Sequence, residues 1–202
     1  MEYQELLWLF SLLPDSYVCI DLETTGLPDI SGPPDIVTIG IVTIRDKQIV
    51  QGAEFQIKPS RPISKSAQDV HGISDQEAAS FRSIESQWPD ISSLLSEQLI
   101  VIHNASFDWP ILIDHTKRFS VKLPSIKGVF CSQKSAFPWA LANKIKCSER
   151  GPSLNTLTEI LRVQDLRGEN EGVHGALIDS RQTALMIERL REEFSPDSLR
   201  KF

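Results

Sequence analysis

What the chain lacks narrows what it can be. Its 202 residues include only three cysteines and no C-x-x-C pair, so a disulfide framework is not expected and a reducing, cytoplasmic location fits best. No run approaches the ~18 consecutive apolar residues of a membrane helix, so no membrane partner is expected. Repeats, heptads and low-complexity tracts are also missing. A hydrophobic content of 41% is typical of one globular domain.

A surplus of positive charge is missing too. The net charge is −6, which argues at first against a nucleic-acid partner, because phosphate-binding domains are usually basic. The charge is unevenly distributed, however. Between Lys117 and Arg150 lie eight basic residues and one acid, which gives this basic segment a charge of +7 and leaves −13 for the rest. We expect the basic segment to run beside the functional site, although its lysines could equally cover two exposed helices.

The chain is organised around the stretch from Val18 to Gly26, which is apolar at first and ends in Thr-Thr-Gly. This pattern predicts a buried strand that leads into a loop. Side chains two apart on a strand share a face, so Asp21 and Glu23 should meet on one side of it. Two like charges ~4 Å apart cost about 4 kcal/mol at an effective dielectric of ~20. A bound cation would offset that repulsion.

A second acidic position follows the apolar run 99–102, which predicts another strand. The sequence His-Asn-Ala-Ser-Phe-Asp comes next, at 103–108, and leads into a helical pattern. Asp108 is therefore expected at a strand-to-helix junction. His103 is interpreted as a hydrogen-bonded residue at the strand end rather than as a catalytic group.

The third acidic position opens the last predicted helix. Asp179 falls in its first turn, where the helix dipole favours an anion, and His174 falls on the preceding loop. Together with the earlier three, this carboxylate completes a set of oxygen ligands without sulphur. Such a set favours magnesium or manganese over zinc. A histidine beside the metals could take a proton near neutral pH.

These residues resemble a known family. The segments DLETTG, HNASFD and HGALID, in that order, are similar to the three exonuclease motifs of the DEDD superfamily, in the DEDDh subgroup with a histidine five residues before the last Asp. Within the motifs the amino-acid sequence is most similar to that of the proofreading epsilon subunit of bacterial DNA polymerase III. The resemblance extends from about Tyr17 to about Leu190.

The order of predicted elements indicates an α/β fold. Three strands in a row are expected: the first lies in the stretch 18–26, and the next two, 36–44 and 49–57, form a hairpin with its turn at Asp46-Lys47. Alternating helices and strands follow, which predicts a mixed sheet with helices on both faces. The resemblance implies the ribonuclease H-like, five-stranded form of this fold. We expect an N-terminal helical extension over 1–16, an exonuclease domain over 17–195 and a short C-terminal tail over 196–202.

The resemblance also implies a mechanism. Two Mg2+ or Mn2+ ions would be held by Asp21, Glu23, Asp108 and Asp179, with Asp21 bridging them and Asp108 reaching one through water. His174 would act as the general base. A single-stranded DNA 3′ end would lose nucleoside 5′-monophosphates. The expected substrate contacts are Leu22, Thr24, His71, Ile73, Asn104 and Phe107.

Two alternatives stay open at this point. The motifs do not fix the sugar preference, so RNA trimming is one of them. A proofreading accessory subunit of a DNA polymerase is the other, with a polymerase or another protein bound through the N-terminal helix. Epsilon-like subunits carry a C-terminal tail that binds the polymerase, whereas this chain stops at Phe202, twelve residues after Leu190. A free-standing nuclease is therefore the favoured expectation.

Overall fold

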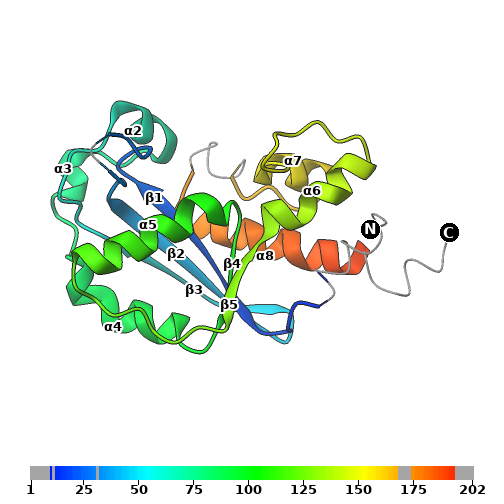
Figure 1. The fold of residues 1–202 in the computed structure, drawn as a ribbon, viewed down its shortest axis with the longest axis horizontal. Helices are drawn as coiled ribbons and strands as arrows, with labels where there is room; N and C mark the ends of the chain where they lie inside the picture. Colours follow the sequence, from blue (N-terminus) through cyan, green and yellow to red (C-terminus); the bar gives the residue numbers. More distant parts are fainter. Residues whose placement is uncertain (1–9, 11, 31, 168–173, 194–202) are drawn as a thin grey trace.

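The structure, a computed structural model, describes residues 10, 12–30, 32–167 and 174–193. Most of the predicted N-terminal extension and all of the predicted C-terminal tail lie outside these residues. Five strands form one mixed sheet, as expected, and their order is β3-β2-β1-β4-β5 (Figure 1). β1 pairs antiparallel with β2 and parallel with β4, so it is the central strand. The strands are β1 (Tyr17–Thr24), β2 (Ile36–Arg45), β3 (Gln48–Gln56), β4 (Leu99–Ile102) and β5 (Gly128–Cys131).

The predicted hairpin joins β2 to β3. Asp46 and Lys47 make the turn, with φ angles of 48° and 64°. Positive φ at both central residues is what a tight two-residue hairpin turn requires, because only that backbone twist matches the flanking strands. β2 is buried along nearly its whole length, whereas β3 is mostly exposed at the edge of the sheet.

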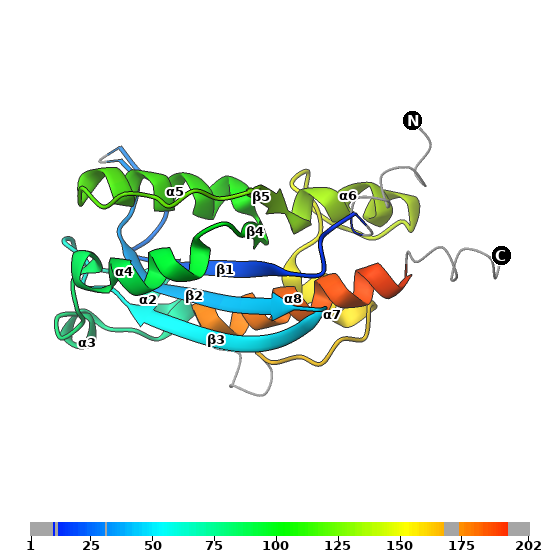
Figure 2. The same ribbon diagram turned by 90° about the horizontal axis from the view of Figure 1, so that it is seen from below.

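Helices cover both faces of the sheet, as predicted (Figures 1 and 2). On one face α4 and α5 enclose a core with Val18, Ile20 and Leu22 of β1. On the other face α6, α7 and α8 pack over Tyr17 and Cys19. The helices are α2 (Lys65–His71), α3 (Asp75–Ala78), α4 (Ile84–Leu95), α5 (Ala105–Arg118), α6 (Ser132–Ala142), α7 (Leu154–Ile160) and α8 (Ala176–Glu193).

Helix boundaries follow their capping residues. Ser64 caps the N-terminus of α2 by accepting from the Ala67 N–H, and Gly72 ends this helix at φ 76°. The sequence predicts a helix over 83–96 that bends or restarts at Pro89, and α4 is one helix that runs through this residue. The three-and-four spacing after Ser153 predicts a buried face that includes Ile160, and this prediction is wrong, since Ile160 is 43% exposed at the last residue of α7.

The chain just before β1 packs on the domain. Phe10 and Leu13 are buried in the core beneath α8, and the Phe10 ring meets Phe130 edge-on at 5.5 Å between centroids. These contacts fit the interpretation of a segment packed on the domain's back, although Leu12 between them is 63% exposed. The sequence predicts a short apolar helix over 2–13, of which residues 2–9 and 11 lie outside the described residues. Within the described part of the chain, no helix is long and apolar enough to cross a membrane.

Candidate active site

Two carboxylates lie at the carboxyl end of the central strand. Asp21 and Glu23 continue the row of β1 side chains that faces α8, as their spacing predicts. Glu23 is only 8% exposed. Asp21 pairs across the sheet with Gly40 of β2, and the register shifts between Glu23 and Thr24, where the strand ends.

Asp108 reaches the same place from the opposite face of the sheet. Its side chain is buried in the first turn of α5. Asn104 precedes this helix with a left-handed φ of 69°, so the chain turns sharply from β4 into α5. Asp108 Oδ1 accepts a hydrogen bond from the Leu22 N–H at 3.2 Å. This bond holds the carboxylate against the end of β1.

Helix α8 brings the fourth carboxylate. Asp179 lies in its first turn, and the helix can seat there because Gly40 of β2 has no side chain. A Cβ at Gly40 would lie 2.1 Å from the carbonyl of Ala176. Ser180 Oγ donates to the Gly40 carbonyl at 3.0 Å and secures the contact. Sequence reasoning missed this role, although a glycine inside a β-branched strand is a known signal of close backbone approach.

His174 lies beside Asp179, before α8 begins. Its Nδ1 is 3.5 Å from Asp179 Oδ2, and its side chain is 38% exposed. Its backbone N–H donates to the Val70 carbonyl at 3.1 Å, which ties this point of the chain to α2. Glu23, His174 and Asp179 offer ligand atoms that all lie within 4.8 Å of one another.

The electrostatics of the cluster favour a cation. Burial, and then the Asp179 charge, raise the pKa of Glu23 to about 8. Burial likewise raises the pKa of Asp108 to about 8. Burial raises the pKa of Asp21 well above its usual range, with the three other carboxylates adding to the shift. These groups repel one another and carry hard oxygen ligands, so the site fits divalent cations such as Mg2+ or Mn2+.

Asp179 differs from the other three carboxylates. Burial alone would raise its pKa, but hydrogen bonds from His174 and Arg167 lower it below its usual range. The guanidinium of Arg167 donates to both carboxylate oxygens of Asp179 and to Asn155 Oδ1 of α7. The stretch 165–172 is polar and contains two glycines, which predicts a loop and gives no sign of either of these partners.

A cavity of about 270 Å³ contains the cluster. The four carboxylates and His174 line it, together with Arg167 and with residues from α5, α6 and α7. Those further lining residues include Asn104, Phe107, Gln133 and Leu154. His103 also lines the cavity, where its Nδ1 lies 3.0 Å from Ser132 Oγ and burial lowers its pKa to about 4. This hydrogen bond agrees with the sequence interpretation of His103.

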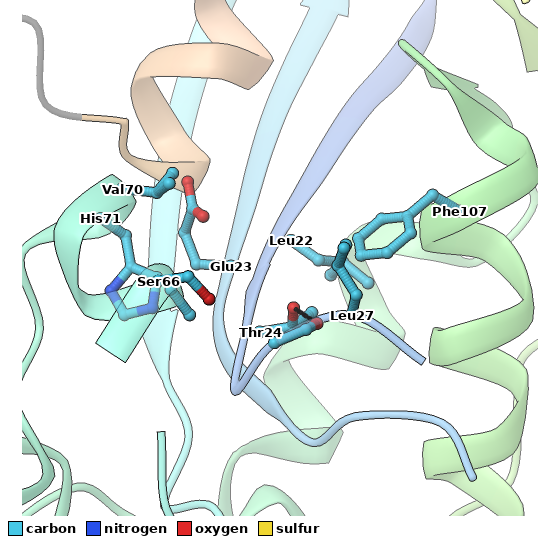
Figure 3. Close-up of a pocket in the computed structure, with 10 residues that line it drawn as sticks. Leu22, Glu23, Thr24, Leu27, Ser66, Val70, His71 and Phe107 are labelled. Carbon is cyan, nitrogen blue, oxygen red and sulfur yellow. Dashed lines mark hydrogen bonds between the residues drawn. The ribbon is translucent and has the colours of Figure 1, made fainter. Parts of the chain in front are cut away.

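A second pocket of about 290 Å³ adjoins the first, and Leu22, Glu23 and Phe107 line both. Figure 3 shows it between the end of β1, α2 and α5, with Val70 and His71 opposite Phe107. Of the predicted substrate contacts, Leu22, Thr24, His71 and Phe107 line this mostly apolar pocket. Asn104 lies on the carboxylate cavity instead. Ile73 lines neither pocket, but its N–H donates to His71 Nδ1 at 3.1 Å and orients that ring.

The basic segment is not uniform in the structure. Lys134, Lys144 and Lys146 are exposed. Arg118 instead bonds to Asp35 and Asp114, so it supports the fold. Trp139 lies among these charges in the sequence, where it could stack on a base or equally belong to the core; it is 8% exposed and packs in the core beneath α8. The lysines near α6 therefore remain the candidates for phosphate contact.

The fold and the site together define an α/β domain with a four-carboxylate cluster suited to divalent cations. The chain belongs to the exonuclease family of the ribonuclease T type, whose model matches residues 18–187. This membership and the five-stranded mixed sheet agree with the resemblance seen in the three motifs.

Comparison with individual relatives supports the same family membership. The chain is 34% identical over 178 residues to the DNA polymerase III PolC-type of Thermotoga petrophila, covering 88% of this chain but 12% of that protein. It is 27% identical to the DNA polymerase III subunit epsilon of Buchnera aphidicola subsp. Schizaphis graminum, over 81% of this chain and 69% of the relative. Among solved structures, exonuclease X in complex with 5′ overhanging duplex DNA superposes with a TM-score of 0.60 at 28% identity, covering 87% and 92% of the two chains.

Proposed function

We propose that this chain is a metal-dependent 3′–5′ exonuclease that releases nucleoside 5′-monophosphates from single-stranded DNA 3′ ends. The observation that carries the proposal is the convergence of Asp21, Glu23, Asp108 and Asp179 with His174 in one cavity. The family membership supports it, because the matched residues include all five of these positions.

The four carboxylates would hold two Mg2+ or Mn2+ ions. Bound ions would supply Lewis-acid stabilisation to the attacking and leaving oxygens of a displacement at phosphorus. His174 has the geometry of a general base, because it is partly exposed at the cavity and its Nδ1 faces Asp179. Asp179 can orient the imidazole so that the other ring nitrogen takes a proton from the attacking water. His103 is a poorer base, since its low pKa makes it a weak proton acceptor.

The apolar pocket beside the cluster would receive the terminal nucleotide. Leu22 and Phe107 line both cavities, so a base or sugar packed against them would place its phosphate beside the carboxylates. Asn104 at the cavity and His71 in the pocket supply polar groups. Ile73 would act through His71, which it orients. The similarity to exonuclease X, solved with duplex DNA, favours DNA over RNA.

A polymerase-associated proofreading role is the second candidate. The 34% identity to a PolC-type DNA polymerase III favours it, since this chain spans only 12% of that relative's length and resembles one segment of it. The polymerase or another protein would then dock through the segment before β1. Binding of this chain to a purified replicative polymerase subunit, measured with and without residues 1–9, would test this role.

The enzymatic proposal is tested by digestion of matched DNA and RNA oligonucleotides with free 3′ ends, in Mg2+ or Mn2+, with identification of the released nucleotide. Asp21→Ala should abolish hydrolysis. His174→Ala should lower turnover by ~10²–10⁴, the usual effect of losing a general base. Asp90→Ala is the matched control, because this exposed carboxylate lies on α4, away from the cavity. Full activity in excess EDTA, or in Asp21→Ala, would refute the proposal.

A further inference from the structure

Arg167 makes the most specific contact in the carboxylate cavity. Its side chain is 12% exposed, and Nε and Nη2 donate to the two different oxygens of Asp179. Nη1 donates to Asn155 Oδ1, so a second element, α7, holds the guanidinium in place. Among the described residues, Arg167 is the one arginine or lysine bonded to any of the four carboxylates.

This pairing conflicts with metal binding. A carboxylate binds a cation through its oxygen lone pairs, and the planar fork of the guanidinium engages both oxygens of Asp179. A divalent ion held by Glu23 and Asp179 would also stand within a few ångströms of the fixed positive charge of Arg167. Arg167 occupies one lone pair on each Asp179 oxygen, and its positive charge opposes a divalent ion at the remaining lone pairs, so the two cations compete for Asp179 in this geometry.

The guanidinium has another anion to bind. Arg167 lines the same cavity that would receive a phosphate, and arginine binds phosphate oxygens in the same forked geometry as carboxylate oxygens. A phosphate in the cavity would thus draw Arg167 away from Asp179. Binding of the phosphate would therefore favour binding of the metal at Asp179. Because linkage is reciprocal, a bound metal would favour binding of the phosphate by the same factor.

We propose that Arg167 is an internal counter-cation that competes with the divalent ion for Asp179 and transfers to the nucleotide phosphate, so that metal and nucleotide bind cooperatively. The proposal rests on the proposed function, since it takes the cavity to be the metal and nucleotide site. It assigns Arg167 a positioning role: the residue controls when Asp179 becomes available.

The test is calorimetric titration with Mn2+, with and without thymidine 5′-monophosphate. In the wild type, the nucleotide should tighten Mn2+ binding about tenfold or more. Arg167→Gln should bind Mn2+ about tenfold more tightly without nucleotide, and the nucleotide should add little. In EDTA this variant should also melt at a lower temperature, because Asp179 loses its partner. Arg162→Gln is the matched control, an exposed arginine at the end of α7 outside the cavity.

A second variant distinguishes loss of the Arg167–Asp179 contact from loss of the positive charge of Arg167. Asn155→Ala loosens the hold on Arg167 and leaves the net charge unchanged, so tighter Mn2+ binding there cannot come from lost positive charge. Unchanged or weaker Mn2+ affinity in both variants, with wild-type protein that binds Mn2+ and degrades DNA, would overturn this proposal alone. Wild-type protein that binds no Mn2+ under either condition would overturn the proposed function as well.

Discussion

The contact between Gly40 and the start of α8 gives a sharp test of how the site is assembled. Gly40 lies opposite Asp21 on β2, and a Cβ there would lie 2.1 Å from both the carbonyl carbon and oxygen of Ala176. The obstruction is helix backbone, so no side-chain rotation can relieve it. Gly40→Ala must therefore push α8 away from the sheet, and Asp179 with it.

The size of the effect follows from the geometry. Ordinary contacts of a Cβ begin near 3.4 Å, so the helix start must move by about 1.3 Å. A misplacement of ~1 Å typically costs ~10²-fold in rate. Overpacking of this kind costs about 1–3 kcal/mol of folding stability, which corresponds to a fall in Tm of roughly 2–12 °C for a domain of this size. We expect a loss of activity that exceeds what the loss of stability explains.

The assay compares hydrolysis of a DNA oligonucleotide, Mn2+ affinity and Tm in Gly40→Ala and Gly52→Ala. Gly52 on β3 is the matched control, because a Cβ there would meet only the side-chain ends of Arg181 and Leu177, at 3.0 Å or more. Those ends can move. Wild-type turnover and metal affinity in Gly40→Ala would refute the claim that this close approach positions Asp179.

Three further predictions follow from charge. Burial opposes the charge of Asp35, but hydrogen bonds from Ser60 and Arg118 lower its pKa. The stability that Asp35 adds to the fold is therefore present above pH ~3.9, the pKa of an unfolded Asp, and is lost as the pH falls through the folded-state pKa. Asp35→Asn should lower the free energy of unfolding by about 3 kcal/mol at neutral pH and by less at pH ~2. Denaturant titrations at the two pH values measure this, and an equal loss at both would contradict the role of the Asp35 charge. Because the pKa values of Glu23 and Asp108 are raised, the folded protein retains protons that the unfolded chain loses near pH ~4. In EDTA the Tm should therefore fall as the pH rises from ~6 to ~9, and Mg2+ should flatten this decline. Identical Tm profiles with and without Mg2+ would exclude cation binding at the carboxylates. Replacing Lys134, Lys144 and Lys146 by Gln should weaken single-stranded DNA binding and reduce its salt slope by roughly 0.7 per lost phosphate contact; an unchanged slope would place the DNA path elsewhere.

Local pattern and the motif resemblance together predicted the carboxylates. Alternation along a strand places Asp21 and Glu23 on one face wherever that strand lies. Helix starts locate Asp108 and Asp179, and the resemblance of their segments to the exonuclease motifs distinguishes them from ordinary capping residues. The same local rules predicted the hairpin turn at 46–47. The mixed sheet and the coverage of both its faces then followed from the order of elements along the chain, whereas the order of the strands within the sheet comes from the structure.

Contacts between distant segments could not be predicted in this way. Gly40 and Ala176 are far apart in sequence, and only the packing of α8 across β2 makes the glycine necessary. Arg167 sits in a polar segment without periodicity, so nothing local indicates that it folds back onto Asp179. Trp139 shows the same limit: the sequence leaves it open between base stacking and core packing, and only the orientation of α6 shows that it is buried.

The position of the site follows from where one strand pairing stops. β4 pairs with β1 only as far as Ile20, so the Leu22 N–H on that side has no strand partner, and Asp108 accepts its hydrogen bond instead. A buried N–H needs an acceptor, so the same bond that completes the backbone brings a carboxylate from α5 to the strand end. Asp21 and Glu23 face α8 and cannot meet a helix on the opposite face anywhere along the paired sheet. Only beyond the last pair with β4 can carboxylates from both faces share one cavity, which is why the four lie at this edge.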